Sequence, residues 1–471
     1  MVMMWLASWS RKEERKRMHF DVLVAEIGST TTVVNAFSGI RGSNGTPDPV
    51  FAGQGQAPTS VLEGDVTRGL KQAVRDLETN LGSGPVTWDE MLATSSAAGG
   101  LRMSVHGLVY DMTVRAAREA ALGAGAIIKL VTAGNLRPSD QNRIRDLRPN
   151  IILVAGGVDY GERDTALNNF EKIARMQLGV PVIYCGNIEN HDDIRAIAAE
   201  WNTRLYIVEN VYPKVDMLNV EPARRIIQDV FEEHIIHAPG MADVREMVNG
   251  PIIPTPGAVM EAAKLLKQHL GNLLVFDVGG ATTDLHSVTV DTEEVSNALI
   301  SPEPEAKRTV EGDLGVFVNL PHIVEKIGAE DLKKEFPDLD DLTATVKAIP
   351  VTEREKLFIE RLTREAVVTA LERHAGTMRT IFAMPGKKTV AEGKDLTGVK
   401  YVIGTGGALT RLPGRMAILE SILNHRKQEA LYPKKGVTFL VDNFYIMASL
   451  GVLSRRYPES ALRLMLQSLG V

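Results

Sequence analysis

The sequence predicts an α/β protein made of two lobes and an inserted α/β subdomain. Three observations lead to this fold class. Two short hairpins with the same acid–glycine–hydroxyl order lie far apart in the chain, at residues 21–37 and 273–290. Between them, residues 127–236 alternate apolar strands with helical stretches, which is typical of a parallel sheet covered by helices. The chain of 471 residues suffices for about three domains at ~150 residues each.

The hairpin at residues 273–290 reads LLVFDVGGATTDLHSVTV. An apolar run, short enough for a buried strand, ends at Asp277, and a second strand follows Asp284. The residues of the turn are Gly279, Gly280, Ala281, Thr282 and Thr283. Consecutive glycines let backbone N–H groups form an anion-binding concavity. A carboxylate beside a phosphate implies a cation between them, and Mg²⁺ suits both kinds of oxygen. Taken alone, the stretch fits an ordinary tight hairpin equally well.

The hairpin at residues 21–37 repeats this order in DVLVAEIGSTTTVVNAF. An apolar strand runs into Glu26, and a second strand returns after the turn. The turn residues are Gly28, Ser29, Thr30 and Thr31. Two such hairpins suggest two half-sites that close on one polyphosphate.

A third glycine-rich loop follows a short strand at residues 401–414, YVIGTGGALTRLPG. Its first residues are Gly404, Thr405, Gly406 and Gly407. Glycine at these positions permits the backbone to approach a flat ligand closely. The loop therefore completes a candidate nucleotide site.

The order of the three loops resembles the superfamily of actin, the heat-shock chaperones and the sugar kinases. There the two hairpins are the phosphate-1 and phosphate-2 loops, and a Gly-Gly loop followed by arginine and proline, here Arg411 and Pro413, holds the adenosine. Residues 277–284 match the pattern D-x-G-G-x-T-x-D at each defined position. The resemblance implies an actin-like (ribonuclease H-like) two-lobed ATPase that uses ATP and Mg²⁺.

The resemblance also implies roles for the three acids. Asp277 would hold the metal and orient the attacking water, while Glu26 and Asp284 would assist around the cation. Glu26 and Asp277 are thus the expected metal ligands. Glu26 departs from the pattern, because the phosphate-1 loop usually carries aspartate at that position.

Composition limits the classes of partner and compartment. A net charge of −6 and a pI near 6.0 argue against nucleic acid as the main partner. The single cysteine, Cys185, excludes an internal disulfide framework and fits a reducing, cytoplasmic location. It follows an apolar run, so we expect a buried strand-end residue rather than a nucleophile.

The predicted domains are residues 1–18, 19–126, 127–238 and 239–471. The first stretch is expected to be disordered or a non-native N-terminal extension, with an interfacial anchor as the alternative. The others are the first lobe, the inserted subdomain and the second lobe. No apolar run reaches the ~18 residues of a membrane helix, so we expect no membrane span.

Five helices are predicted outside the insert's alternating region, at residues 63–81, 116–126, 258–270, 353–374 and 442–453. The helix at 353–374 carries many charges, which suggests a solvated face, and Thr352 with Glu355 forms its expected capping box. Glu311 and Asp313 are a close acid pair that lies near the metal or is simply exposed. His286 half-matches D-x-H-x-x-G, but the glycine is missing, so we do not expect a metal ligand there.

The loop order, the inserted segment and the phrases SSAAGGLRM, ILVAGG and RTVEGDLG together resemble the glutamate mutase accessory family, MutL or GlmL. This resemblance implies an ATP-dependent reactivating chaperone for an adenosylcobalamin-dependent mutase or aminomutase. A homo-oligomer is compatible with it. A small-molecule kinase, an ATP-dependent amidohydrolase and an actin-like scaffold carry similar loops and remain alternatives.

Overall fold

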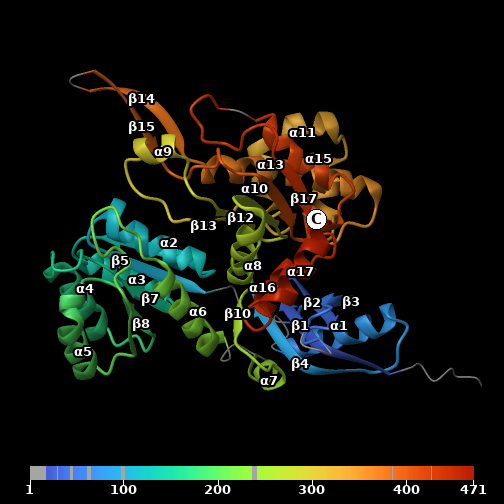
Figure 1. Ribbon diagram of the computed structural model, residues 1–471, viewed down its shortest axis with the longest axis horizontal. Coiled ribbons are helices and arrows are strands. Elements are labelled where there is room, and N and C mark those ends of the chain that lie inside the picture. Colours follow the sequence, from blue (N-terminus) through green and yellow to red (C-terminus); the bar gives the residue numbers. More distant parts are fainter. Residues whose placement is uncertain are drawn as a thin grey trace, which may run out of the picture.

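The computed structural model describes residues 17–28, 30–42, 46–60, 65–96, 101–235, 241–383, 386–425 and 427–471. Two lobes lie side by side, and the inserted subdomain extends from them to the left of Figure 1. Of the predicted N-terminal extension only residues 17 and 18 are described, and Met18 already begins the first strand.

The first lobe is built on a mixed sheet. Its strands, in spatial order, are β10 (Ile252–Pro254), β4 (Val86–Ser95), β1 (Met18–Ile27), β2 (Thr31–Ser38) and β3 (Val50–Pro58). β1, β2 and β3 form an antiparallel meander, whereas β4 and β10 extend the sheet in parallel from β1. The apolar runs of β1 and β2 are buried on both faces, as expected for strands covered by helices.

The second lobe repeats this topology strand for strand. Its sheet consists of β13 (Ala306–Glu311), β12 (Thr283–Val288), β11 (Leu273–Val278), β16 (Tyr401–Thr405) and β17 (Thr438–Val441). β11 to β13 form the meander, and β16 and β17 extend it in parallel from β11. Two copies of one sheet topology confirm the predicted actin-like two-lobed fold.

The two lobes share a core made by three helices. These are α8 (Thr255–Leu270), α16 (Met447–Leu453) and α17 (Pro458–Leu469). Their apolar side chains pack with residues of β1 and β11 in one cluster. A side chain at Gly451 would lie 1.8 Å from the carbonyl oxygen of Ala258, so α16 and α8 pack backbone to backbone at this point. The shared helices hold the two sheets next to one another.

The inserted subdomain has a third sheet whose strands are all parallel, as predicted. In spatial order they are β6 (Ile127–Ala133), β5 (Arg102–Gly107), β7 (Ile151–Val154), β8 (Val182–Tyr184) and β9 (Leu205–Ile207). Its helices are α2 (Arg115–Gly123), α3 (Pro138–Leu147), α4 (Asp164–Arg175) and α5 (His191–Glu200). α6 (Glu221–Ile235) and α7 (Met241–Met247) return the chain to the first lobe.

The sheets do not divide at the predicted boundaries. β5 lies before residue 127 but pairs with β6 and β7 of the insert. β10 lies after residue 238 but pairs with β4 of the first lobe. The reason is that parallel strands need long crossover connections, so strands that are neighbours in space lie far apart in sequence.

Two of the predicted helices differ in part from the structure. α13 (Glu353–His374) has the predicted bounds and the predicted capping box, but ten of its residues are buried, so the expectation of a solvated face holds for one side only. The helix predicted at residues 442–453 begins at Met447 instead. The carboxylate of Asp442 accepts hydrogen bonds from the amides of Ile446 and Met447 (2.9 and 2.8 Å), which fixes a turn before the helix.

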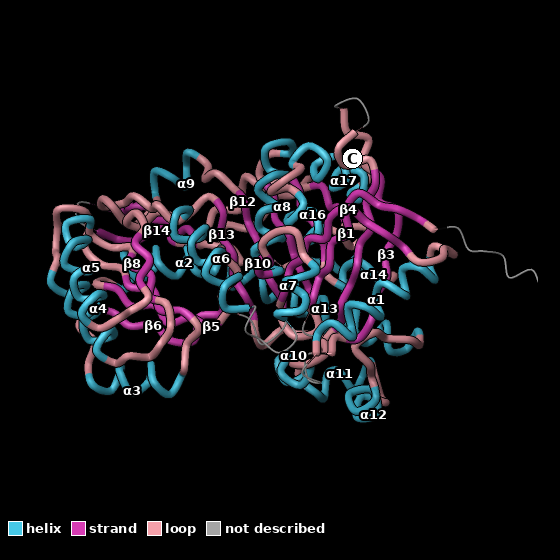
Figure 2. The backbone as a smooth tube through the Cα atoms, turned by 90° about the horizontal axis from the view of Figure 1, so that it is seen from below, coloured by secondary structure: helices cyan, strands magenta, loops and turns pink. Residues whose placement is uncertain are grey.

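The remaining elements are one helix that packs on the first sheet and several elements of the second lobe. They are α1 (Val66–Asn80) of the first lobe, and α9 (Glu293–Ala298), α10 (Leu320–Ile327), α11 (Ala329–Glu335), α12 (Leu339–Thr345), α14 (Gly407–Arg411), α15 (Arg415–Glu420), β14 (Thr377–Ala383) and β15 (Gly386–Glu392). β14 and β15 form a separate antiparallel ribbon, which lies toward the insert's end of the molecule in both views (Figure 1, Figure 2). No helix among the described residues is long and apolar enough to cross a bilayer.

Candidate functional site

The two predicted hairpins have the same backbone geometry. In the first, the amide of Gly28 donates to the carbonyl of Thr31 over 2.9 Å, and in the second the amide of Gly279 donates to the carbonyl of Thr282 over 2.9 Å. Glu26 and Asp277 each precede the turn glycine by two residues, on β1 and β11. The structure therefore gives these two acids equivalent places. Ser29, at the first turn, lies outside the described residues.

The carbonyl groups of Gly279, Gly280 and Ala281 in the second turn accept hydrogen bonds from the loop after β13. The carbonyl of Gly279 accepts from the amide of residue 316 (3.3 Å), and that of Gly280 accepts from the amides of residues 317 and 318 (2.9 and 2.7 Å). The side-chain amide of Asn319 donates to the carbonyl of Ala281 over 2.7 Å. The amides of Gly280 and Ala281 make no hydrogen bond to another described residue. Such a turn offers donors rather than acceptors, as an anion site requires.

The glycine-rich loop of residues 404–407 lies directly against Asp277. β16 runs parallel to β11, with Thr405 paired to Asp277. Gly406 has a φ of +82°, and a Cβ there would lie 2.5 Å from Oδ1 of Asp277. Gly407, at the start of α14, has open space where a Cβ would lie. The sheet thus brings the second hairpin and the glycine-rich loop together, as the sequence predicted.

Glu26 from the first lobe and Asp277 from the second lie close enough to influence each other's charge, together with the buried Asp284 and Asp442. Burial, followed by the nearby Asp277 and Asp442, raises the pKa of Glu26 to about 8. Burial, followed by Asp284 and Asp442, raises the pKa of Asp277 to about 7, against the opposing effect of Arg308. One oxygen of Glu26, Oε2, has no hydrogen-bond partner among the described residues. These carboxylates raise one another's pKa, and Arg308 offsets the effect only in part.

A divalent cation fits this arrangement. Bound between Glu26 and Asp277, it would favour the ionised form of both groups and give the unpartnered Glu26 oxygen a ligand. No cluster of three or more metal-binding side chains occurs in the described ranges. The protein would thus supply at most part of the coordination shell. Mg²⁺ bound through one or two carboxylates completes its shell with phosphate oxygens and water.

Glu26 should make the stability of the nucleotide-free protein depend on pH. Its folded-state pKa exceeds the ordinary value of 4.5, so its contribution to stability is fully present below about pH 4.5 and is lost as the pH rises through about 8. We expect Glu26→Gln to raise the melting temperature by a few degrees at about pH 9 and by little at about pH 4. Scanning calorimetry with the exposed Glu200→Gln as control tests this, and equal shifts at both pH values would contradict it.

Asp442 belongs to the site but was not predicted. Asp442 directly follows β17, much as Glu26 and Asp277 lie at the ends of β1 and β11. An acid at the end of a buried strand was therefore the sequence feature that could have identified it. Its carboxylate accepts from the hydroxyls of Thr405 (3.0 Å) and Ser468 (2.6 Å), besides the two amides that open α16. Asp442 is thus a buried acid committed to the local structure, and it acts on the site through its charge.

Asp284 is held by a buried arginine that sequence reasoning also missed. Oδ1 of Asp284 accepts from Nε and Nη2 of Arg308 (2.8 and 2.5 Å), and Oδ2 accepts from the hydroxyl of Thr282 (3.0 Å). Arg308 also donates through Nη1 to the carbonyls of Leu122 and Ala126 (3.0 and 3.3 Å). Those carbonyls lie at the end of α2, in the insert. Arg308 therefore connects the second hairpin to the inserted subdomain, and a role for Asp284 near the cation remains a prediction.

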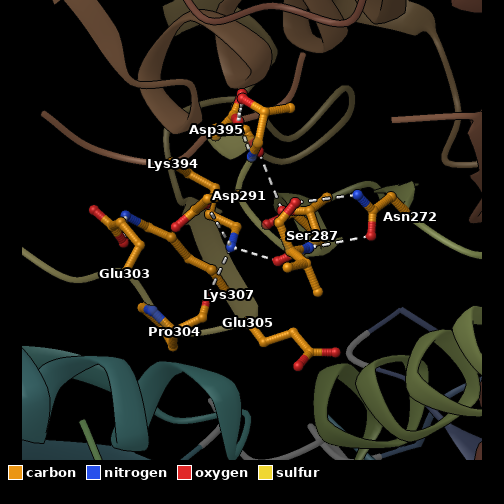
Figure 3. Close-up of polar contacts among 12 residues, drawn as sticks. Asn272, Ser287, Asp291, Glu303, Pro304, Glu305, Lys307, Lys394 and Asp395 are labelled. Carbon is orange, nitrogen blue, oxygen red and sulfur yellow. Dashed lines mark hydrogen bonds and ion pairs between the residues drawn. The ribbon is translucent and has the colours of Figure 1, made fainter. Parts of the chain in front are cut away.

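A buried polar cluster fixes the outer ends of β12 and β13. Lys394 donates to the carbonyls of Thr289 and Pro304 (2.9 and 2.8 Å), as Figure 3 shows. Lys307 pairs with Glu303 over 2.8 Å, and Glu303 also contacts Arg115 at the start of α2. α2 is thus anchored to the second lobe by Arg115 at its start and through Arg308 at its end.

Besides Thr282, whose hydroxyl donates to Asp284, two of the predicted hydroxyl donors are used within the protein. The hydroxyl of Thr283 is buried and donates to the carbonyl of Leu314 over 2.8 Å, and that of Thr405 donates to Asp442. Thr30, Thr31 and Thr282 lie half-buried at the turns. Thr283 and Thr405 can therefore contact a ligand only through their backbones.

Side chains from both lobes meet beside the glycine-rich loop. Arg411 contacts the side-chain oxygen of Gln54, which lies on β3, and its guanidinium lies 5.8 Å from the ring centroid of Tyr445. Gln54 donates to the side-chain oxygen of Asn35 over 2.8 Å. Tyr445 has a φ of +54°, and Glu26, followed by burial, raises its pKa. Arg411 was part of the predicted adenosine loop, whereas Gln54 and Tyr445 were not predicted.

The remaining candidate residues make contacts of their own. Glu311 and Asp313 both pair with Arg373 (2.6 and 2.7 Å). Glu311 is buried, so the exposed-acid interpretation does not hold for it. His286 is fully buried, and burial, followed by Arg308, lowers its pKa, so the residue is neutral. Burial raises the pKa of the Cys185 thiol, as expected for an unreactive cysteine.

Comparison with known proteins agrees with the family predicted from the sequence. The family model described as MutL protein matches residues 22–469. The chain belongs to the MutL family. "Protein MutL" of Clostridium tetanomorphum is 34% identical to this MutL chain over 422 residues, which cover 86% of the chain and 91% of the relative.

Solved structures resemble the MutL chain only in outline. A nucleotide-free acetone carboxylase is 11% identical, with a TM-score of 0.38 over 92% of this chain and 70% of that one. Component A of (R)-2-hydroxyglutaryl-CoA dehydratase from Acidaminococcus fermentans is 10% identical, with a TM-score of 0.30 over 94% and 99%. Neither likeness is close enough to transfer a substrate or an activity to this MutL protein.

Proposed function

We propose that this MutL family member is an ATP-dependent reactivating factor for an adenosylcobalamin-dependent mutase or aminomutase, of the glutamate mutase kind. It would bind Mg²⁺–ATP between its lobes. It would use hydrolysis to open an inactivated mutase, so that damaged cobalamin leaves and fresh coenzyme enters. The proposed setting is the cytoplasm.

The observation that carries the nucleotide part is the equivalence of the two hairpins. Glu26 and Asp277 hold the same position before turns with the same hydrogen bond, and Gly406 lies against Asp277. Two turns of this kind can hold the two ends of one polyphosphate, while the third loop leaves room for a nucleoside. The mutual repulsion of the acids is the reason why we expect a cation at this site.

The chemistry we propose is positioning and charge neutralisation, which dominate phosphoryl transfer. Asp277 would hold the cation and orient the attacking water, and Glu26 would assist from the other lobe. Amides of the turns would donate to the phosphate oxygens. Loss of the γ-phosphate removes contacts to one hairpin, so the lobes can reopen. The bridge from Gln54 to Arg411 is one of the described contacts that such an opening would break.

The partner is proposed from family membership and from the sequence resemblance. A remodelling factor works only if the partner binds its two states with different affinity. A protein with two lobes around a nucleotide and a separate subdomain has the parts for this: one part changes state and another contacts the partner.

The test is hydrolysis of Mg²⁺–ATP by the whole protein, alone and with a glutamate mutase or aminomutase whose cobalamin has been inactivated. We expect stimulation by the inactivated mutase, recovery of mutase activity, and loss of both with excess EDTA. Steady hydrolysis that ignores the mutase would favour a metabolite kinase or amidohydrolase. Filament formation with ATP would favour a scaffold.

A further inference from the structure

The inserted sheet presents an apolar surface at one edge. Among the described residues between 101 and 235, all the large apolar side chains that are exposed lie in the segments after the carboxyl ends of β5, β7, β8 and β9. These side chains are Val109, Tyr110, Tyr160, Ile188, Val215 and Met217, exposed by 42 to 78%. Carboxyl ends of parallel strands meet at one edge of a sheet, so these residues gather on one surface. We call it the carboxyl-edge surface.

Hydrogen bonds to one residue tie the loops of this surface together. The side chain of Asp159 accepts from the amide of Ile188 (3.1 Å) and from the side chain of Asn210 (3.0 Å), and its own amide donates to the carbonyl of Pro213 (2.9 Å). Tyr160, the next residue, is 78% exposed and has a φ of +63°. A large aromatic ring is thus held outward by a braced backbone, as in protein–protein hot spots.

The same loops leave little room for a small ligand. The strand order 2-1-3-4-5 would place a ligand between the carboxyl ends of β5 and β7. There, a Cβ at Gly156 would already lie 3.5 Å from Leu108 and 3.2 Å from Ala166. Between the carboxyl ends of β7 and β8 lies the buried side-chain amide of Asn187, which donates to two carbonyls of the loop after β7. The surface is therefore suited to a protein.

The charges around the surface indicate the chemistry of that protein. The loops of residues 108–114, 134–137, 155–163, 185–190 and 208–220 expose five acids, Asp111, Glu162, Glu189, Glu209 and Asp216, against three bases, Arg137, Arg163 and Lys214. Arg163 already lies 3.9 Å from Glu189 and 3.8 Å from Asp193. An acidic rim around an apolar centre attracts a basic rim, and it disfavours a second copy of this acidic chain.

We propose that the carboxyl-edge surface docks a folded protein with an apolar centre and a basic rim. This inference rests on the proposed function, under which that protein is a subunit of the mutase. The position of the surface supports it, because the helical stretch that begins at Tyr110 continues into α2, whose last turn carries the Leu122 carbonyl that Arg308 binds. One helix thus joins the docking surface to the second hairpin.

The experiment compares the whole protein with the variant Tyr160→Asn/Val215→Asp. Both side chains are exposed, and asparagine tolerates a positive φ, so the variant should keep its melting temperature. Val351→Asp, a substitution of an equally exposed valine (68% against 64%) in the second lobe, is the matched control. Binding to a purified mutase with inactivated cobalamin is measured by interferometry, basal hydrolysis is measured in parallel, and each chain alone is examined by sedimentation velocity.

We expect the double variant to bind the mutase roughly 30-fold more weakly, with basal hydrolysis unchanged and the control like the wild type. Salt should weaken wild-type binding. Equal binding by the double variant and the wild type would overturn the docking surface and leave the proposed function standing. A wild type that hydrolyses ATP but binds no mutase would overturn both. Self-association of the wild type that the double variant loses would assign the surface to a second copy instead.

Discussion

Replacing Asp277 by alanine is expected to abolish Mg²⁺-dependent ATP hydrolysis, with a loss of roughly 100-fold or more. The carboxylate lies between the second hairpin and the glycine-rich loop, and no other described acid occupies an equivalent place in that lobe. The melting temperature without nucleotide should not fall at about pH 8, because the variant removes a charge that its neighbours repel. Steady-state turnover and differential scanning calorimetry measure the two effects.

Two controls sharpen this result. Asp277→Asn keeps the shape of the side chain and removes the charge, so it should lose turnover as Asp277→Ala does. Asp229→Ala removes an exposed acid of α6 and should change neither turnover nor stability. Unchanged hydrolysis in Asp277→Ala would remove Asp277 from the mechanism, and with it the equivalence between the two hairpins as a catalytic feature.

Gly406→Ala should disable the nucleotide site through shape alone. The new Cβ would lie 2.5 Å from Oδ1 of Asp277 and 2.5 and 2.6 Å from the backbone oxygen and nitrogen of Val278, and the φ of +82° disfavours any side chain. We expect a lower melting temperature and a loss of nucleotide affinity of roughly 100-fold. Fluorescent-nucleotide titration measures the affinity.

The neighbouring glycine supplies the matched comparison. A Cβ at Gly407 meets nothing within 4 Å, so Gly407→Ala should keep the melting temperature of the wild type. If both variants lost stability equally, the close approach of the loop to Asp277 would not be the cause.

The parts of the site that the sequence predicted are local in the chain. Each hairpin carries its acid, its glycine and its hydroxyls within a few residues, so strand periodicity and turn chemistry sufficed to find them. The capping box of Thr352 and Glu355 is equally local, and it formed as predicted.

The parts that the sequence did not predict depend on distant partners. Arg308 lies inside a strand, and nothing in the sequence around it indicates its hydrogen bond to Leu122, which is distant in the chain. Asp442 looked like the start of a helix, because its hydrogen bonds to Thr405 and Ser468 are not visible in a linear pattern. The divisions at residues 127 and 239 failed for the same reason, since β5 and β10 join sheets whose other strands lie elsewhere in the chain.

The double attachment of Arg308 has a thermodynamic consequence. One guanidinium binds both Asp284 and the end of α2. A cation or phosphate that moves Asp284 away from Arg308 would therefore also change the hydrogen bonds that Arg308 makes to the insert. Linkage is reciprocal: if nucleotide alters the affinity of the insert for its partner by some factor, the partner alters nucleotide affinity by the same factor. Couplings of this kind are typically about 1–3 kcal/mol. Nucleotide titrations with and without the partner would reveal it, and identical affinities would mean that Arg308 only holds the insert to the second lobe.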